Sequence, residues 1–246
     1  MKHYVEVSDQ ALVQIVMNSL EAFVVLHKGR KRSGIEMHGV LVGYKDEHEE
    51  DTQTSKQYKI DFFSPDTSAV MMPDHCIPQA ESESLKNEVA RCFSDFEVIG
   101  AFHTHPYLYT EIKQDDKLDF MRKEGCHFSD EDMDFFTAKL LNNSQEDENY
   151  QLEGVLAVFN SKKYNDKRDG RLEDEDNVFE FSVGNLKCFL RMQVFSLDEE
   201  GAIQEEETIL KCSCLEKFKY IGKSFFDFGR IKVKENKKVI LEHKIQ

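Results

Sequence analysis

Two histidines and a distant aspartate are the residues of this chain whose types and spacing best suit metal chemistry. His103 and His105 stand two residues apart near the end of the apolar run 97–106, which indicates a β-strand. Because residues i and i+2 of a strand point to the same face, both imidazoles can reach one point. Asp132 lies three residues after Ser129, a candidate N-cap of an acidic helix start. Two neutral imidazoles and one carboxylate, with a fourth position open for water, form the ligand set of a catalytic zinc ion.

A carboxylate upstream could serve such a site as a general base. Glu36 stands near the start of the apolar run 35–43, which predicts a buried strand closed by Gly43. A lone carboxylate at the edge of a buried strand is costly unless it has a partner or a chemical task. Accepting a proton from an attacking water molecule is such a task. We therefore expect Glu36 in the same site.

These pieces together resemble the JAB/MPN metalloprotease family, also called JAMM. The matching elements are Glu36 with Gly39 and Gly43, the run His103-Thr104-His105-Pro106, and the pair Ser129 and Asp132. The resemblance spans roughly residues 1–185 and is specific, because separated elements agree in type and in order. It implies an α/β fold in which helices flank a mixed β-sheet in three layers. It also implies zinc on His103, His105 and Asp132, with Glu36 as general base and Ser129 as a second catalytic group that stabilises the oxyanion.

The third metal ligand has two candidates. The family's usual gap between the second histidine and the ligand aspartate is short, and that spacing points to Asp116. No serine stands three residues before Asp116, where Lys113 lies instead. Asp132 has Ser129 in that place and a Phe-containing helix behind it, so Asp132 is preferred. Residues 107–128 then form an insertion, which a fold tolerates because the cost of closing a loop grows slowly with its length.

The resemblance also implies an activity. Members of the family hydrolyse the peptide or isopeptide bond after the C-terminal tail of ubiquitin or a ubiquitin-like protein, in deconjugation or precursor processing. The divergent spacing suggests a prokaryotic-type member. Some bacterial members are encoded beside ubiquitin-transfer-like enzymes in antiviral defence, so the expected partners are a ubiquitin-like protein, its conjugates and such enzymes.

Two other readings stay open. One is a catalytically inactive MPN-like scaffold that binds protein partners, although scaffolds tend to lose the ligands that this chain retains. The other is a zinc-dependent deaminase, whose Pro-Cys-x-x-Cys element is absent here. A second zinc at Cys126 and His127, with help from His75 and Cys76, has only weak support.

Composition limits the classes of partner and the compartment. The formal net charge of the 246 residues is −15, which argues against nucleic acid and against an anionic membrane surface, because both require basic side chains. No apolar run is long enough to span a membrane, and the N-terminus is not a secretory signal. Six cysteines are scattered without a disulfide framework. We therefore expect a cytoplasmic protein.

The order of apolar patterns predicts a layered α/β domain over residues 1–185, followed by a β-rich C-terminal extension, 186–246, packed on the same domain. We expect residues 45–56 to form an exposed hairpin loop. The insertion 107–128 mixes aromatic and charged residues and should border the metal and shape substrate access; the alternative is a passive surface excursion. The remaining expected helices are 8–24, 82–96 and 129–142, and the remaining strands are 4–7, 57–63, 152–160, 178–183, 187–197 and 203–210.

Overall fold

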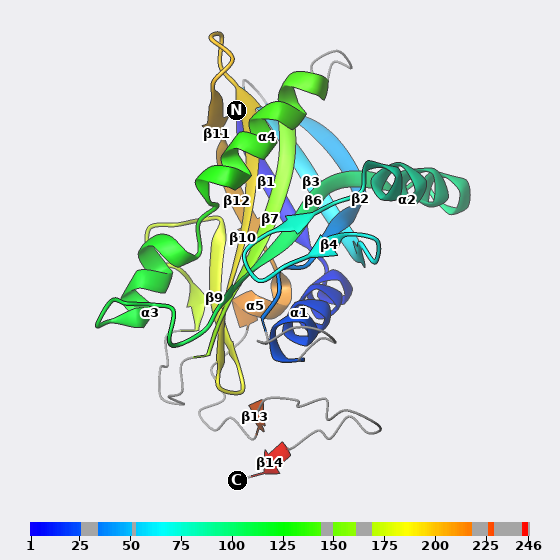
Figure 1. Ribbon diagram of the computed structural model, residues 1–246. Coiled ribbons are helices and arrows are strands. Elements are labelled where there is room, and N and C mark those ends of the chain that lie inside the picture. The colour runs from blue at the N-terminus through cyan, green and yellow to red at the C-terminus, as the bar shows by residue number, and fades with distance from the viewer. Residues whose placement is uncertain are drawn as a thin grey trace.

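One large mixed β-sheet dominates the protein, with few helices beside it, so the expected α/β class is confirmed (Figure 1). The structure is a computed structural model that describes residues 1–25, 34–50, 53–143, 150–160, 169–217, 226–228 and 243–245. Within these ranges, none of the helices is long and apolar enough to cross a membrane.

The main sheet has ten strands in the order β12-β1-β3-β2-β6-β7-β10-β9-β8, with β11 paired to β10. The strands of this sheet are β1 (Lys2–Val7), β2 (His38–Glu50), β3 (Gln53–Pro65), β6 (Glu97–Tyr107), β7 (Tyr150–Asn160), β8 (Gly170–Arg171), β9 (Val178–Val183), β10 (Leu186–Leu197), β11 (Ile203–Glu205) and β12 (Glu207–Lys211). Strand β1 runs parallel to both of its neighbours, and β6 runs parallel to β7. The other pairs are antiparallel. Two small sheets join β4 (Val70–Met71) to β5 (Cys76–Ile77) and β13 (Phe226–Phe228) to β14 (His243–Ile245).

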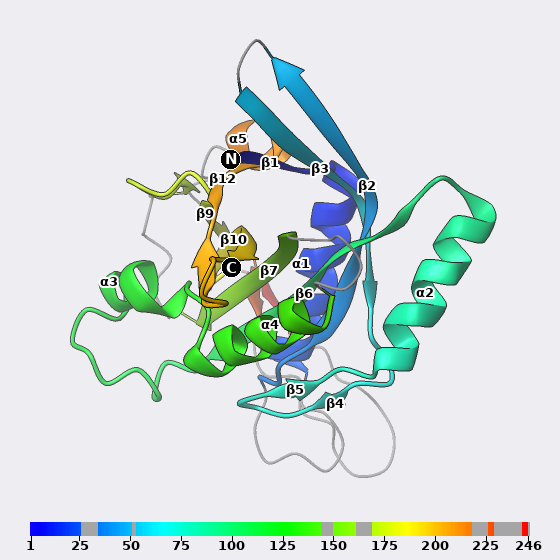
Figure 2. The same ribbon diagram turned by 90° about the horizontal axis from the view of Figure 1, so that it is seen from above.

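The sheet curls around its main hydrophobic core, with α1 inside the curl (Figure 2). Ser8 starts α1 (Asp9–Val24), because its side chain accepts a hydrogen bond from the backbone N–H of Ala11. The apolar face of α1, including Ile15, packs among side chains from β1, β3, β6, β7 and β10. Burial of this face, rather than helix propensity, is what holds α1 in place.

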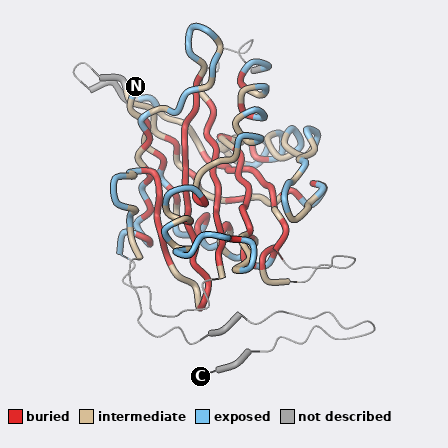
Figure 3. Tube along the Cα trace, turned by 60° about the vertical axis from the view of Figure 1, so that its left-hand side comes forward, coloured by how far each residue is buried: buried red, intermediate tan, exposed pale blue. Residues whose placement is uncertain are grey.

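The other helices are α2 (Ala80–Phe93), α3 (Lys117–Phe120), α4 (Asp130–Asn143) and α5 (Ser213–Lys217), with a π-helical turn η1 (Met121–Gly125) after α3. Helix α2 packs with Ala90 against Val40 and Val42 of β2, whose neighbour Leu41 faces the main core. Helix α4 packs with Phe136 and Leu140 against Phe195 of β10. Side chains therefore alternate between the main core and the face that carries α2 and α4, and buried strands run through the centre of the molecule (Figure 3).

The insertion 107–128 is not a loose surface excursion. Ile112, Met121 and Cys126 are buried in a second hydrophobic cluster with Phe159 of β7 and Phe189 of β10. The segment therefore packs on the same face of the sheet as α4, and its packing fixes its path. The sequence mixes apolar and charged residues here without a clear period, which is why the burial of these three side chains was not predicted.

The structure differs from three other sequence expectations. Residues 45–50 and 53–56 are strand and not loop, because β2 and β3 pair as far as Glu50 and Gln53; the two residues between them lie outside the described residues. Strand β2 begins at His38, so Glu36 precedes the strand instead of lying within it. The region 186–211, assigned above to a C-terminal extension, supplies β10, β11 and β12 to the main sheet. Most of the remaining tail lies outside the described residues.

The buried His3 predicts a pH-dependent stability. The His3 side chain is fully buried beside the ring of Tyr150, at a centroid distance of 4.8 Å, and burial lowers its pKa from 6.5 to about 4, although the Glu206 carboxylate opposes this effect. As pH falls from about 7 to 5, the His3 imidazole of the unfolded chain binds a proton, whereas the buried imidazole of the folded protein stays neutral. The free energy of unfolding therefore falls over this range. The loss is about 2 kcal/mol.

Urea unfolding at pH 7 and pH 5 measures this loss, with His3→Phe as the comparison. The phenylalanine cannot titrate, so the variant should lose about 2 kcal/mol less between the two pH values. An equal loss in both proteins would show that other groups cause the pH dependence.

Candidate metal centre

Strand β6 places both histidines on the face that carries α4. His103 and His105 are buried and lie beside Val155 and Ala157 of β7 in the parallel register. Between them, Thr104 points the other way, and its hydroxyl accepts a hydrogen bond of 2.9 Å from the backbone N–H of Met37. Pairing with β7 and the bond to Met37 therefore hold strand β6 in place. The two imidazoles point to the same side of the sheet, as the strand period predicted.

Asp132 reaches the histidines from the first turn of α4. Ser129 caps this helix: its Oγ accepts from the Asp132 N–H at 3.2 Å. In return, the Ser129 N–H and hydroxyl both donate to Asp132 Oδ2 at 2.8 Å. This reciprocal set of bonds resembles a capping box, in which side chain and backbone hold each other. It fixes the orientation of the Asp132 carboxylate toward β6.

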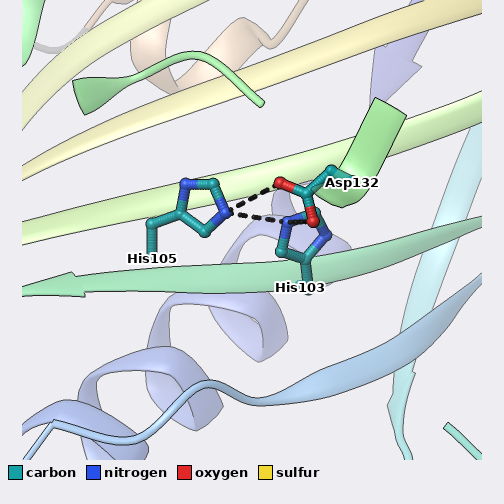
Figure 4. A group of neighbouring side chains, drawn as sticks. All are labelled: His103, His105 and Asp132. Atoms are coloured by element: carbon teal, nitrogen blue, oxygen red, sulfur yellow. Dashed lines mark hydrogen bonds and ion pairs between the residues drawn. The ribbon is translucent and has the colours of Figure 1, made fainter. Parts of the chain in front are cut away.

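The three side chains converge at the spacing of metal ligands (Figure 4). His103 Nε2 lies 3.0 Å from His105 Nε2. Asp132 Oδ1 lies 3.2 Å from His103 Nε2, and Oδ2 lies 3.2 Å from His105 Nε2. Donor atoms about 2.0–2.1 Å from a tetrahedral zinc ion are about 3.3 Å apart. Two imidazole nitrogens and one carboxylate at this spacing therefore fit a zinc ion or a similar divalent cation, with one position left open.

The site favours the charged form of Asp132. Burial alone would raise the pKa of Asp132, but hydrogen bonds and charge from His103 and His105 outweigh burial and hold the pKa well below its usual range. Metal ligands must be deprotonated, so a carboxylate that stays ionised at all ordinary pH values is suited to the task.

Glu36 faces the same cleft from the segment before β2. Its backbone N–H donates to the Met72 carbonyl at 2.7 Å, and its neighbours Ile35 and Met37 are buried. Burial raises the pKa of Glu36 to about 7; the charge of His105 opposes this rise and that of Asp132 adds to it. A carboxyl group with a pKa near neutrality can both take up and release a proton, as a general base requires.

These residues line a cleft of about 910 Å³. One wall comes from the β4–β5 segment, including His75 and Cys76. The opposite wall comes from the insertion, including Tyr107 and Phe120. The cleft volume lies in the upper part of the range for ligand sites, about 300–1,000 Å³. The insertion therefore borders the candidate metal site, as its connection to β6 and α4 predicted.

Two further residues, Asp116 and His38, lie outside the metal cluster. Asp116 is exposed and caps α3, where its carboxylate accepts from the Asp119 N–H at 3.0 Å, and it is not part of the metal cluster. His38 lines the cleft beside His103, but burial lowers its pKa to about 3, and it lies outside the cluster of converging ligand atoms.

Cys126 and His127 do form a second group of potential ligands, with Glu175. The guanidinium of Arg191 is in direct contact with this group. It donates to the Glu175 carboxylate and lies 3.2 Å from His127 Nε2. A bound cation would have to share Glu175 with this arginine. The group is therefore better described as an arginine-centred polar network than as a metal site.

Glu153 is a buried carboxylate of the site that the sequence reasoning missed. It is almost fully buried on β7, lines the cleft, and has Lys139 at 3.9 Å and the side chain of Gln151 as partners. Burial raises its pKa. The signal was present, because Glu153 interrupts an apolar strand in the same way that Glu36 interrupts the run 35–43. A carboxylate at such a position is costly unless it has a partner or a chemical task, and this applies to Glu153 as it does to Glu36.

No model of a protein family matches the chain, and no curated protein sequence is similar to it. The case for a metal centre therefore rests on the arrangement of His103, His105 and Asp132.

Replacing each candidate aspartate by asparagine tests which of the two is the third ligand. Asp132→Asn should lose the metal, because a neutral amide is a poor ligand for zinc and cannot balance its charge. Asp116→Asn, which alters only the cap of α3, should bind as the unsubstituted protein does. Metal content after dialysis, measured by mass spectrometry, should be about one zinc per chain for the protein and for Asp116→Asn. The reverse pattern would assign the ligand to Asp116.

Proposed function

We propose that this chain is a zinc metallopeptidase of the JAB/MPN (JAMM) type. It would hydrolyse the peptide or isopeptide bond after the C-terminal tail of a ubiquitin-like protein, in deconjugation or precursor processing. The observation that carries the proposal is the convergence of His103, His105 and Asp132 at zinc-ligand spacing in a cleft that also contains Glu36. The class of substrate comes from the sequence resemblance alone.

The fold supports the proposal in one respect. Helix α1 lies on one side of the sheet, and α2 and α4 lie on the other. The sheet dominates this α/β fold, so the three-layer MPN arrangement is itself part of the proposal. The six cysteines are unpaired thiols, which suits the reducing cytoplasm. A cytoplasmic role beside ubiquitin-transfer-like enzymes is part of the same proposal.

A zinc ion bound by these three residues would act as a Lewis acid and make a water molecule nucleophilic near neutral pH. The Glu36 carboxylate accepts the proton of the attacking water and delivers it to the leaving amine. Its raised pKa, about 7, suits a group that must change protonation state during each turnover.

Ser129 has two tasks in this scheme. Its hydroxyl donates to Asp132 Oδ2 at 2.8 Å, so its first task is to hold the ligand. Stabilising the oxyanion requires the hydroxyl to turn from Asp132 toward the substrate. The Ser129 N–H keeps its own bond to Asp132 Oδ2 during such a turn, so the ligand stays in place while the hydroxyl moves.

Replacing Glu36 tests the chemistry separately from the metal. Glu36→Gln keeps the shape of the side chain but cannot accept a proton, so we expect zinc content to be unchanged and kcat to fall by about 10²- to 10⁴-fold. The assay follows cleavage of a reporter fused to the C-terminal glycine of ubiquitin. A variant that loses its zinc would make Glu36 a ligand. A variant that retains both zinc and turnover would show that Glu36 is not the base.

Substitutions in the insertion wall test substrate contact. Lys113 and Gln114 are exposed and line the cleft, so the double variant Lys113→Glu/Gln114→Ala should leave the metal site and the second hydrophobic cluster intact. We expect KM for the ubiquitin fusion to rise about fivefold, which corresponds to about 1 kcal/mol of lost contact energy. KM for a short peptide amide should change little.

The matched control is Lys123→Glu, because Lys123 is exposed on η1 and does not line the cleft. Its kinetics should equal those of the unsubstituted protein on both substrates. If the double variant raised KM equally for the fusion and the short peptide, the insertion wall would not contact the protein part of the substrate.

A further inference from the structure

The segment before the Ser129 cap is held to the sheet at several points. We call residues 121–127 the anchor segment. At its start, the Arg122 guanidinium makes two parallel hydrogen bonds to Glu180 of β9, with Nε–Oε2 at 2.7 Å and Nη2–Oε1 at 2.9 Å. At its end, His127 contacts Arg191 of β10 at 3.2 Å.

Apolar contacts strengthen this attachment. Met121 and Cys126 are fully buried in the second hydrophobic cluster. The next residue, Phe128, packs on Phe136 at 5.3 Å and on Phe195 of β10 at 5.5 Å between ring centroids. A continuous set of contacts therefore leads from Arg122 to the residue before Ser129.

The ion pairs around Arg122 hold the start of the anchor segment in one position. Glu180 and Lys187 are almost fully buried, and Lys187 bridges Glu180 at 2.7 Å and Asp169 at 2.8 Å. Arg122 completes this network of two cations and two anions. A buried pair with a planar guanidinium adds geometric specificity, because only one orientation satisfies both hydrogen bonds.

This attachment matters because of where the third ligand lies along the chain. Asp132 follows a connection of more than twenty residues after His105. A connection left free would spread Asp132 over many positions, and ordering it would then oppose metal binding. A connection already fixed to the sheet presents the carboxylate at the correct distance before the metal arrives.

We propose that Arg122 and Arg191 are positioning residues for the metal centre: by anchoring residues 121–127 to β9 and β10, they set the place of Asp132 and so the affinity for the metal. This inference rests on the metal site of the proposed function. It assigns a chemical consequence to two arginines that are not among the residues lining the cleft.

The test is the zinc affinity of Arg122→Met and Arg191→Met, measured by competition with a chromophoric chelator well below the unfolding temperature. Arg191→Met leaves Glu175 partly exposed to water. Arg122→Met leaves Lys187 as the shared cation of the buried Glu180 and Asp169, so it should also lower stability, which the control below separates from an effect on the metal site. We expect each variant to bind zinc about tenfold more weakly. The visible spectrum of the cobalt-substituted protein should change as well, since it reports ligand geometry.

The control is Leu12→Ala, which removes a buried side chain of α1 from the main core inside the curl. It should lower Tm at least as much as either arginine variant while leaving the zinc Kd and the cobalt spectrum unchanged. An equal loss of affinity in Leu12→Ala would make the effect one of general stability and overturn the inference.

Two further results separate the possibilities. Unchanged zinc Kd and cobalt spectrum in both arginine variants would overturn the inference while the proposed metal site stood. Absence of zinc binding by the unsubstituted protein would overturn the proposed function and the inference together. If Arg122→Met failed to fold, Arg122→Lys would decide: it retains the charge without the paired bonds, so weakened binding supports the inference and unchanged binding overturns it.

Discussion

The alternation of side chains along β6 is the constraint on which the candidate site depends. This central strand sends Phe102 and Thr104 to one side and His103 and His105 to the other. Phe102 packs in the main core, so a shift of register by one residue would bury the imidazoles in apolar surroundings and expose the phenylalanine. The same packing that stabilises the sheet therefore holds both histidines at the cleft, and no separate structure is needed to orient them.

Much of this arrangement could be predicted because it is local. The strand period places His103 and His105, and the Ser129 cap with its acidic first turn places the start of α4. Preference for Asp132 over Asp116 followed from Ser129, which matches the serine of the family pattern, and from the helix behind it. The structure brings Asp132, and not Asp116, to the two histidines. Patterns of this kind can be recognised from the residues of a single helical turn or a single strand.

The parts that could not be predicted depend on contacts between distant segments. Residues 45–56 are polar and indicated a loop, yet cross-strand pairs such as Glu47 with Lys56 let both strands extend there. The parallel pairing of β12 with β1 brings residues 207–211 beside residues 2–6 in one sheet, and no periodicity reveals which strands become neighbours. Burial of Met121 likewise depends on Phe159 and Phe189, which lie far along the sequence.

The bonds between Ser129 and Asp132 also bear on how such a site can change over evolution. The ligand is held by its own helix cap through three hydrogen bonds within four consecutive residues. Strand and helix can then be treated as two modules, one carrying two ligands and one carrying the third with its support. The connection between them is free to gain or lose residues, provided that its last part docks on the sheet. A lineage could thus remodel one wall of the cleft, and with it the molecules that fit there, without rebuilding the three candidate ligands.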